Sequence, residues 1–236
     1  MPTWASISDG EKMRKIALVL ASCLLAGGAS AAERYLFTEL SAGRSHMKPE
    51  TEATSGVFNG VAVSNARFKL KYDDPTAYGF EIGGSDFAGT PLRAGLFFVT
   101  AKANLREASG SGTLTQGSRV WNLQETVTAA ELRSVGLDFD NRVNLYGVTA
   151  YYDFNRDASV KPFVGVALGQ ADFENARDRK FAAGLHLGLN LDLSKNTYLG
   201  VRLSTYRVNG PTDKIGLRYE DLTLTNVGLQ LGFRSF

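Results

Sequence analysis

The stretch NLYGVTAYYDFNRDASVKPFVGVALG, residues 144 to 169, decides the fold. In its first half every second residue from Tyr146 to Phe154 is apolar, and the residues between are Gly147, Thr149, Tyr151 and Asp153. After the polar turn at 155–159, valine and leucine alternate with glycine and alanine. A period of two places successive side chains on opposite faces, so both halves are predicted to be two-faced β-strands.

The same alternation recurs along the rest of the chain. The most regular case runs from Phe181 to Leu193, where an apolar residue occupies every second position without a gap. Together with the opening pair, the predicted strands number eight, the others being 34–45, 77–85, 92–103, 198–206 and 226–234. An even number of antiparallel strands returns the chain to the side where it began, as in single-chain bacterial barrels.

The connections between these strands alternate in length. The long ones are 46–76, 105–142, 174–180 and 208–221, and the short ones are 86–91, 155–159 and 194–196. Segment 66–72 alternates briefly, so hairpin extensions at the edges of the first long loop are one possibility; a short helix within 121–134 is a weaker one that we do not adopt. This order predicts an all-β fold: an eight-stranded antiparallel transmembrane β-barrel with short periplasmic turns and four longer extracellular loops.

The composition agrees with a barrel without requiring one. Of the 236 residues, 44% are hydrophobic and the formal net charge is +2. Only alternate residues of a barrel strand face lipid, so average hydropathy does not decide the question. The near-neutral charge gives no indication of nucleic acid as a partner. A soluble periplasmic β-protein stays open, because alternation alone does not prove contact with lipid.

Residues 1–31 read as a signal peptide, with translation expected to start at Met13. A basic MRK segment precedes an apolar run, and an A-x-A site predicts cleavage before Ala32, which leaves 32–236 as the barrel. The only cysteine, Cys23, lies inside the apolar run. Lipidation at Cys23 is the alternative, although the preceding residues make a poor lipoprotein box.

Two segments resemble the opacity-type porin family of eight-stranded outer-membrane barrels, which are related in architecture to the OmpA transmembrane domain. AYYDFNRDASVKPFVGVALG (150–169) is similar to the family's Y-Y-D-F, turn, P-Y-V-G hairpin, and SDFAGTPLRAG (85–95) is similar to its D-F-x-T-P-L-R segment. Gly95 stands where the family often has an acidic residue. The C-terminal LGFRSF departs in another way, because Phe233 and Phe236 are out of phase and a bulge would be needed to align them.

The polar faces of the strands are expected to line the barrel. An eight-stranded barrel has an interior that side chains fill, and charges there must pair. The nearly balanced set therefore predicts a packed salt-bridge plug in preference to a conducting pore. Its members are Glu39, Glu81, Asp153, Asp192, Arg93, Arg202, Arg234, Gln230, Asn190 and His186.

Aromatic residues gather at the strand ends that are predicted to be periplasmic. Such a cluster predicts an interfacial girdle, although aromatic residues are also good strand formers. The residues expected at this rim are Tyr35, Phe37, Phe87, Tyr152, Phe154, Phe163, Tyr198, Phe233 and Phe236.

No catalytic, cofactor-binding or metal site is expected, because no known motif for one is present. A hydrolase would need a histidine beside a serine and an acid. The chain offers only His46, next to Ser45 with no acid nearby in sequence, and His186, which faces inward by phase.

The sequence therefore predicts a non-enzymatic, cell-surface protein in the outer membrane of a Gram-negative bacterium, serving surface interaction, adhesion or envelope integrity. A narrow diffusion porin and a lipid A-modifying enzyme are the alternatives. The expected partners are outer-membrane lipid and lipopolysaccharide, the barrel-assembly machinery through the C-terminal strand, and a host or surface ligand through the loops. The resemblance implies host contact for some relatives, and the mixed loop charges name no ligand.

Overall fold

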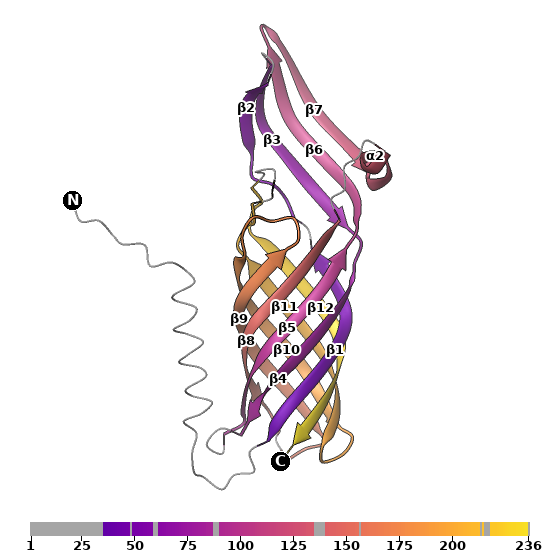
Figure 1. The fold of residues 1–236 in the computed structure, drawn as a ribbon, viewed down its shortest axis with the longest axis vertical. Coiled ribbons are helices and arrows are strands. Elements are labelled where there is room, and N and C mark those ends of the chain that lie inside the picture. The colour runs from indigo at the N-terminus through magenta and orange to yellow at the C-terminus, as the bar shows by residue number, and fades with distance from the viewer. Residues whose placement is uncertain are drawn as a thin grey trace, which may run out of the picture.

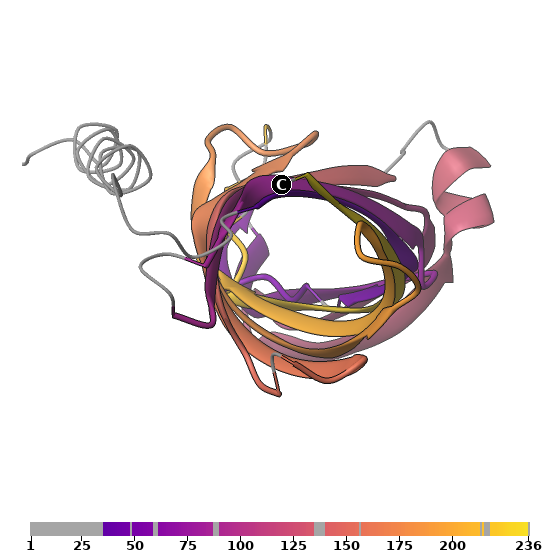
Figure 2. The same ribbon diagram turned by 90° about the horizontal axis from the view of Figure 1, so that it is seen from below.

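The computed structural model describes residues 35–47, 49–58, 61–86, 90–134, 140–155, 157–212, 214 and 218–235. Eight antiparallel strands form a closed barrel in the order β1-β12-β11-β10-β9-β8-β5-β4 (Figures 1 and 2), which confirms the predicted fold class. The barrel strands are β1 (Leu36–Met47), β4 (Thr76–Ser85), β5 (Leu92–Ala103), β8 (Asn141–Asp153), β9 (Val160–Phe173), β10 (Lys180–Asp192), β11 (Thr197–Val208) and β12 (Leu222–Ser235).

The two-residue period determines which side chains face outward. On β10, Leu185, Leu187, Leu189 and Leu191 are 45–62% exposed, whereas the intervening His186 and Asn190 are buried. The same alternation on every barrel strand surrounds the barrel with an exposed apolar belt. A monomeric protein in water does not expose a patch of that size. A closed barrel with such a belt is the architecture of bacterial outer-membrane proteins, and we place the chain in that membrane.

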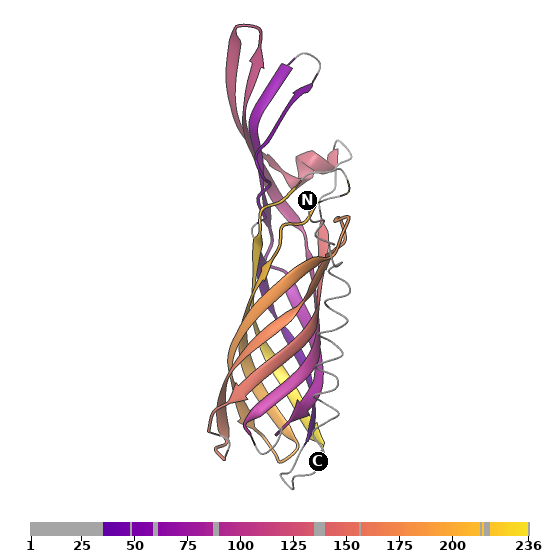
Figure 3. The same ribbon diagram turned by 90° about the vertical axis from the view of Figure 1, so that its left-hand side faces the viewer.

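A second sheet stands beyond one end of the barrel (Figures 1 and 3). It contains β2 (Thr54–Phe58), β3 (Val61–Tyr72), β6 (Leu105–Gln116) and β7 (Arg119–Thr128), in the antiparallel order β2-β3-β6-β7. The first two long connections are therefore not simple loops, because they pair with each other through β3 and β6. Segment 66–72 does lie in a hairpin extension, but its partner, β6, is distant in sequence. We call these four strands the extracellular sheet.

A short helix, α2 (Ala129–Ser134), follows β7 and lies outside the ring of barrel strands (Figure 2). The residue pattern indicated a helix in 121–134 only weakly, and the first part of that segment is strand. Helix α2 begins with a capping box: Glu131 Oε2 accepts hydrogen bonds from the Thr128 amide at 2.7 Å and the Thr128 hydroxyl at 2.8 Å. No helix among the described residues is long and apolar enough to cross a membrane.

The other connections alternate between the two ends of the barrel as expected. The turns 86–91, 154–159 and 193–196 lie at one end, and the connections 48–75, 104–140, 174–179 and 209–221 lie at the other. The connection at 174–179 spans no more residues than the turns at 86–91 and 154–159, so it is not one of the long connections. The end that carries the long connections and the extracellular sheet is the outer end.

The predicted aromatic girdle is only partly correct. Tyr152, Phe154 and Phe233 are 43–46% exposed on the outside of the barrel. Phe37, Phe163 and Tyr198, by contrast, are at most 1% exposed. These three are in phase with the polar lumen residues of their strands, so their rings fill the interior instead of marking the membrane surface. Phe87, Phe236 and the predicted signal peptide lie outside the described residues.

Candidate functional site

The predicted charge network occupies the inner half of the barrel. Glu39, Glu81, Arg93, Asp153 and Arg234 are each at most 9% exposed, which confirms that these side chains face the lumen. The structure adds Lys161, which was not among the predicted members. With Arg202 and Asp192, the network holds four basic and four acidic groups, namely Arg93, Arg202, Arg234 and Lys161 with Glu39, Glu81, Asp153 and Asp192.

Arg93 on β5 joins two carboxylates. Its Nη1 donates to Glu39 Oε1 at 2.7 Å and its Nε donates to Asp153 Oδ2 at 2.7 Å. Aromatic rings surround the guanidinium: its Cζ lies 4.7 Å from the ring centroid of Tyr151 and 5.2 Å from that of Phe37. Cation–π contacts of this kind gain strength where water is excluded. The inward aromatic residues Phe37 and Tyr151 therefore stabilise the buried charge of Arg93.

Arg202 on β11 neutralises a second pair of carboxylates. Glu39 and Glu81 face each other directly across β1 and β4, an arrangement in which like charges repel. Arg202 Nη1 donates to Glu81 Oε2 at 2.9 Å, and its Nη2 donates to Glu39. Thr149 and Tyr151 also donate to Glu81, at 2.5 and 2.9 Å. The two glutamates thus share one arginine and are otherwise bonded to hydroxyl groups and, for Glu39, to Arg93.

The third part of the network lies nearer the periplasmic turns. Asp192 accepts a hydrogen bond from Lys161 at 2.6 Å and forms an ion pair with Arg234 at 2.8 Å. Asn190 accepts from Gln230 at 2.5 Å in the adjacent layer. Every basic side chain of the network therefore has an acidic partner, as the plug hypothesis requires.

The outer half of the lumen is apolar, in contrast to the polar lining predicted for the barrel. On β12 the inward side chains change from Gln230 and Asn226 to Leu224 and Leu222, which are 2% and 3% exposed. The cluster also contains Leu70 from the extracellular sheet. Its members include Met47, Tyr72, Phe97, Ala103, Leu105, Val143, Leu145, Ala171, Phe173, Tyr206 and Val208. An apolar layer thus separates the charge network from the outer end, and burial in it raises the pKa of the Tyr72 hydroxyl.

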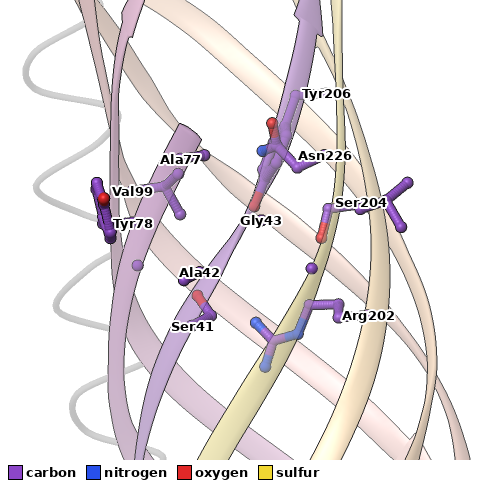
Figure 4. A pocket seen from close by; sticks show the side chains of 13 residues that line it. Ser41, Ala42, Gly43, Ala77, Tyr78, Val99, Arg202, Ser204, Tyr206 and Asn226 are labelled. Atoms are coloured by element: carbon purple, nitrogen blue, oxygen red, sulfur yellow. The ribbon is translucent and has the colours of Figure 1, made fainter. Parts of the chain in front are cut away.

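A small cavity lies beside Arg202, between the charge network and the apolar cluster (Figure 4). Ser41, Ser204, Tyr206 and Asn226 are among the residues that line it. Its volume is about 40 Å³, which suits ordered water and is too small for a solute molecule. At this level of the lumen there is therefore no space for a solute.

The structure explains why position 95 holds a glycine, where the opacity-type pattern often has an acidic residue. Gly95 faces the lumen on β5, and a Cβ at this position would come 3.1 Å from the Phe37 ring and 3.2 Å from Glu81 Oε1. An acidic side chain here would place a third carboxylate beside Glu81. Glycine instead leaves room for Phe37, whose ring contacts Arg93.

The candidate Ser45 and His46 pair does not form a catalytic dyad. The two residues are consecutive in β1 and point to opposite faces: Ser45 is 2% exposed, and the His46 side chain is 52% exposed. The structure does bring an acid to His46, since its Nδ1 lies 2.5 Å from Asp74 Oδ1. His186 is buried as predicted, with Nδ1 2.9 Å from the Tyr151 hydroxyl. No group of acidic, histidine or cysteine residues suited to a metal occurs among the described residues.

One face of the extracellular sheet carries large apolar side chains, with the exposed Glu125 among them. Strand pairing aligns Val63 with Leu114 and Leu114 with Trp121, and it aligns Phe68 with Gly110 further along β6. These residues share a face because alternate positions of β6 point to the same side. Phe68 and Trp121 are each 41% exposed. We call Val63, Phe68, Leu114 and Trp121 the apolar face. Towards the barrel, Ala129 and Leu132 of α2 pack against the apolar cluster.

The opposite face of the extracellular sheet is mostly polar, with Val120 as an exposed apolar exception. Ser109 and Thr126 hydroxyl groups lie 2.9 Å apart, and Thr113 donates to Asn122 at 3.1 Å. Lys71 donates to Glu107 at 2.9 Å. Cross-strand pairs of these kinds stabilise a sheet that has no second layer. We call this side the hydroxyl face.

Comparison with known proteins finds similar solved structures at low sequence identity. No protein-family model matches the chain, and no curated protein matches it. Similar solved structures include Neisserial surface protein A, with 12% identity over 87% of this chain and 99% of the other and a TM-score of 0.48. A major outer membrane protein from Thermus thermophilus has 12% identity over 86% of this chain and 100% of the other, with a TM-score of 0.46.

A further similar structure is Ail, the attachment invasion locus protein of Yersinia pestis. It has 14% identity over 84% of this chain and 98% of the other, with a TM-score of 0.37. Because these TM-scores lie below 0.5, the barrel assignment rests on the strand pairing of the chain itself. That pairing gives the eight-stranded architecture of opacity-type and OmpA-like barrels that the sequence resemblance implied.

Proposed function

We propose that this chain is a non-enzymatic outer-membrane protein that is exported by a cleaved signal peptide and binds other surfaces through its extracellular sheet. The observation that carries the proposal is the apolar face, where Phe68 and Trp121 stay 41% exposed on a paired sheet that extends beyond the membrane. Exposed aromatic side chains on a rigid scaffold favour recognition, because little conformational entropy is lost on binding. The plugged lumen supports a role for the outer surface over one for the interior.

Adherence of whole cells tests this proposal. A non-adherent Gram-negative host would express the wild type, the variant Phe68→Ser/Trp121→Ser, and a control variant of the hydroxyl face, Ser109→Ala/Thr113→Ala. Retention would be counted on polystyrene and on an epithelial cell layer. We expect wild type and control to be retained above the empty vector, and the apolar-face variant to lose most of that retention. Equal retention of vector and wild type on both surfaces would refute the proposal.

A conductance measurement distinguishes the proposed function from the alternative of a narrow porin. Planar bilayers containing the purified barrel would show discrete conductance steps if the lumen were open. We expect none, because the charge network and the apolar cluster both cross the lumen. Steady steps from the folded wild type would favour the porin.

A further inference from the structure

The outer rim of the barrel carries a row of basic residues on its lipid-facing side. Arg44 on β1 pairs with Thr76 on β4, and Lys102 on β5 pairs with Arg142 on β8. The β4–β5 register places Thr76 next to Lys102, so the row is continuous. All four side chains are exposed, and their strands lie side by side in the barrel (Figure 1). We call Arg44, Lys102 and Arg142 the cationic row.

The cationic row stands at the level of lipid headgroups. On β5 the outward positions run from Leu92 at the inner end to Lys102. Ten residues with a rise of about 3.4 Å and a tilt of about 40° cover about 26 Å, close to the apolar band of about 25 Å in such barrels. Tyr78, the next outward residue below Thr76, is 60% exposed. Interfacial tyrosines mark the membrane surface.

Lys102 and Arg142 are like charges at directly opposed positions. Such side chains have Cβ atoms about 5 Å apart, and like charges there are destabilising. Among the described residues, no carboxylate forms an ion pair with either one. An anion between them would relieve this repulsion.

The nearest acidic residues further out along these strands are already engaged. Asp74 lies two residues beyond Thr76, and its carboxylate is 2.5 Å from His46. Asp140 lies two residues beyond Arg142; it pairs with Arg133 at 3.0 Å and accepts a hydrogen bond from the Leu105 amide. These carboxylates therefore do not neutralise the cationic row, and the exposed Glu174, whose amide donates to the Arg142 carbonyl oxygen, forms no ion pair with Arg142.

Two other arginines at the outer end of the barrel, Arg179 and Arg207, do form ion pairs. Arg179 Nε lies 3.6 Å from Asp172 Oδ2, and Arg207 Nη2 lies 3.3 Å from Asp221 Oδ2. Both pairs belong to the sector formed by β9 to β12. Among the described residues, these two arginines therefore have acidic partners, unlike Lys102 and Arg142.

We propose that the cationic row binds the phosphate groups of an anionic glycolipid in the outer leaflet of the membrane. Arginine presents paired donors that match phosphate oxygens, and lysine adds a compact charge. Arg44 Nη1 is held in place by the Asp74 carbonyl oxygen at 2.8 Å. The Thr76 hydroxyl supplies a further donor in the middle of the row. Acyl chains of the same lipid would lie against the apolar belt below.

Native mass spectrometry of the purified barrel with added lipid A tests this site. The probes are diphosphoryl lipid A, the same lipid without its phosphates, and inorganic phosphate as a competitor. The variant Lys102→Gln/Arg142→Gln would be compared with Lys195→Gln/Arg119→Gln, which removes two exposed charges away from the row. Heat-dependent mobility on gels would show that each variant is folded.

The wild type should bind diphosphoryl lipid A, with dephosphorylated lipid bound far more weakly. Loss of two row charges should weaken binding roughly 30-fold, and the control should bind as the wild type does. An equal loss in both variants would mean general electrostatic attraction and would overturn the site. Unchanged binding by the row variant would overturn it too, as would displacement of the lipid by millimolar inorganic phosphate.

Discussion

Arg93 is the side chain on which the interior of the barrel depends most directly. It is 3% exposed and bonds Glu39 and Asp153, which are also buried. A buried charge that loses its partner keeps its full desolvation cost. The contribution of Arg93 is therefore larger than that of any arginine in an exposed ion pair.

Replacing Arg93 with methionine should lower the free energy of unfolding by about 3–5 kcal/mol, because two carboxylates would stay buried without it. Arg67→Met is the matched control, since its ion pair with Glu220 is 42% and 47% exposed and should contribute less than about 1 kcal/mol. Urea unfolding in phospholipid vesicles measures both. Similar losses in the two variants would contradict the assigned role of Arg93.

Gly232 makes room for a lumen aromatic residue. It is opposed to Tyr198, whose ring occupies the space that a Cβ would need. The Tyr198 hydroxyl donates to Glu39, and its ring lies 4.4 Å from Arg234 Cζ. Gly232→Val should cost at least about 1–3 kcal/mol by overpacking. Leu231→Val, one residue away and facing lipid, should stay within about 0.5 kcal/mol in the same urea assay. A tolerated valine would show that Tyr198 can move without loss.

Helix α2 is a short element with a defined pH dependence. The hydrogen bonds from the Thr128 amide and hydroxyl hold the pKa of the Glu131 carboxyl below its ordinary value of 4.5. Because the folded pKa is lowered, the stabilisation is present above the ordinary pKa and is lost as the pH falls through the folded pKa. Without the cap, a helix of six residues is too short to persist.

Amide hydrogen exchange across residues 129–134 should therefore become faster, relative to the β7 amides, when the pH falls from about 7 to about 3. Glu131→Gln removes the titrating group, so the helix should show little further change over that range. The same acid response in both proteins would indicate that another group controls α2.

At the scale of the whole molecule, we expect the barrel to fold without the outer part of the extracellular sheet. Residues 54–66 and 111–124 can each be replaced by a short Gly-Ser turn at positions that pair across their hairpins, Thr54 with Ala66 and Ser111 with Gln124. The lower part of the sheet, including Leu70 and Ala108, stays to cover the apolar cluster. The trimmed chain should retain its heat-dependent gel mobility and show no conductance. An unfolded product would mean that the outer sheet is needed for assembly.

Alternation along the chain determined most of the barrel. Strand β5 was predicted at the residues it occupies, and the inward residues Glu39, Glu81 and Arg93 were identified from phase alone. The reason is physical: in a barrel wall, lipid on one side and a narrow lumen on the other impose a two-residue period on every strand. The inward aromatic residues were predicted wrongly. Their phase along the strand indicated the lumen, but their position at strand ends was taken to indicate the membrane surface.

Tertiary structure alone decided what happens beyond the membrane and how the charges are paired. β3 and β6 lie far apart in the chain, with β4 and β5 between them, and no local pattern shows that they pair. Their alternation is weak because one sheet exposed on both faces has no buried side to enforce it. Partner choice for Arg93 and Arg202 likewise depends on barrel closure, which brings Glu39 beside side chains from β5 and β11. The sequence determined which face most residues of the barrel strands occupy; register and closure determined which residues meet.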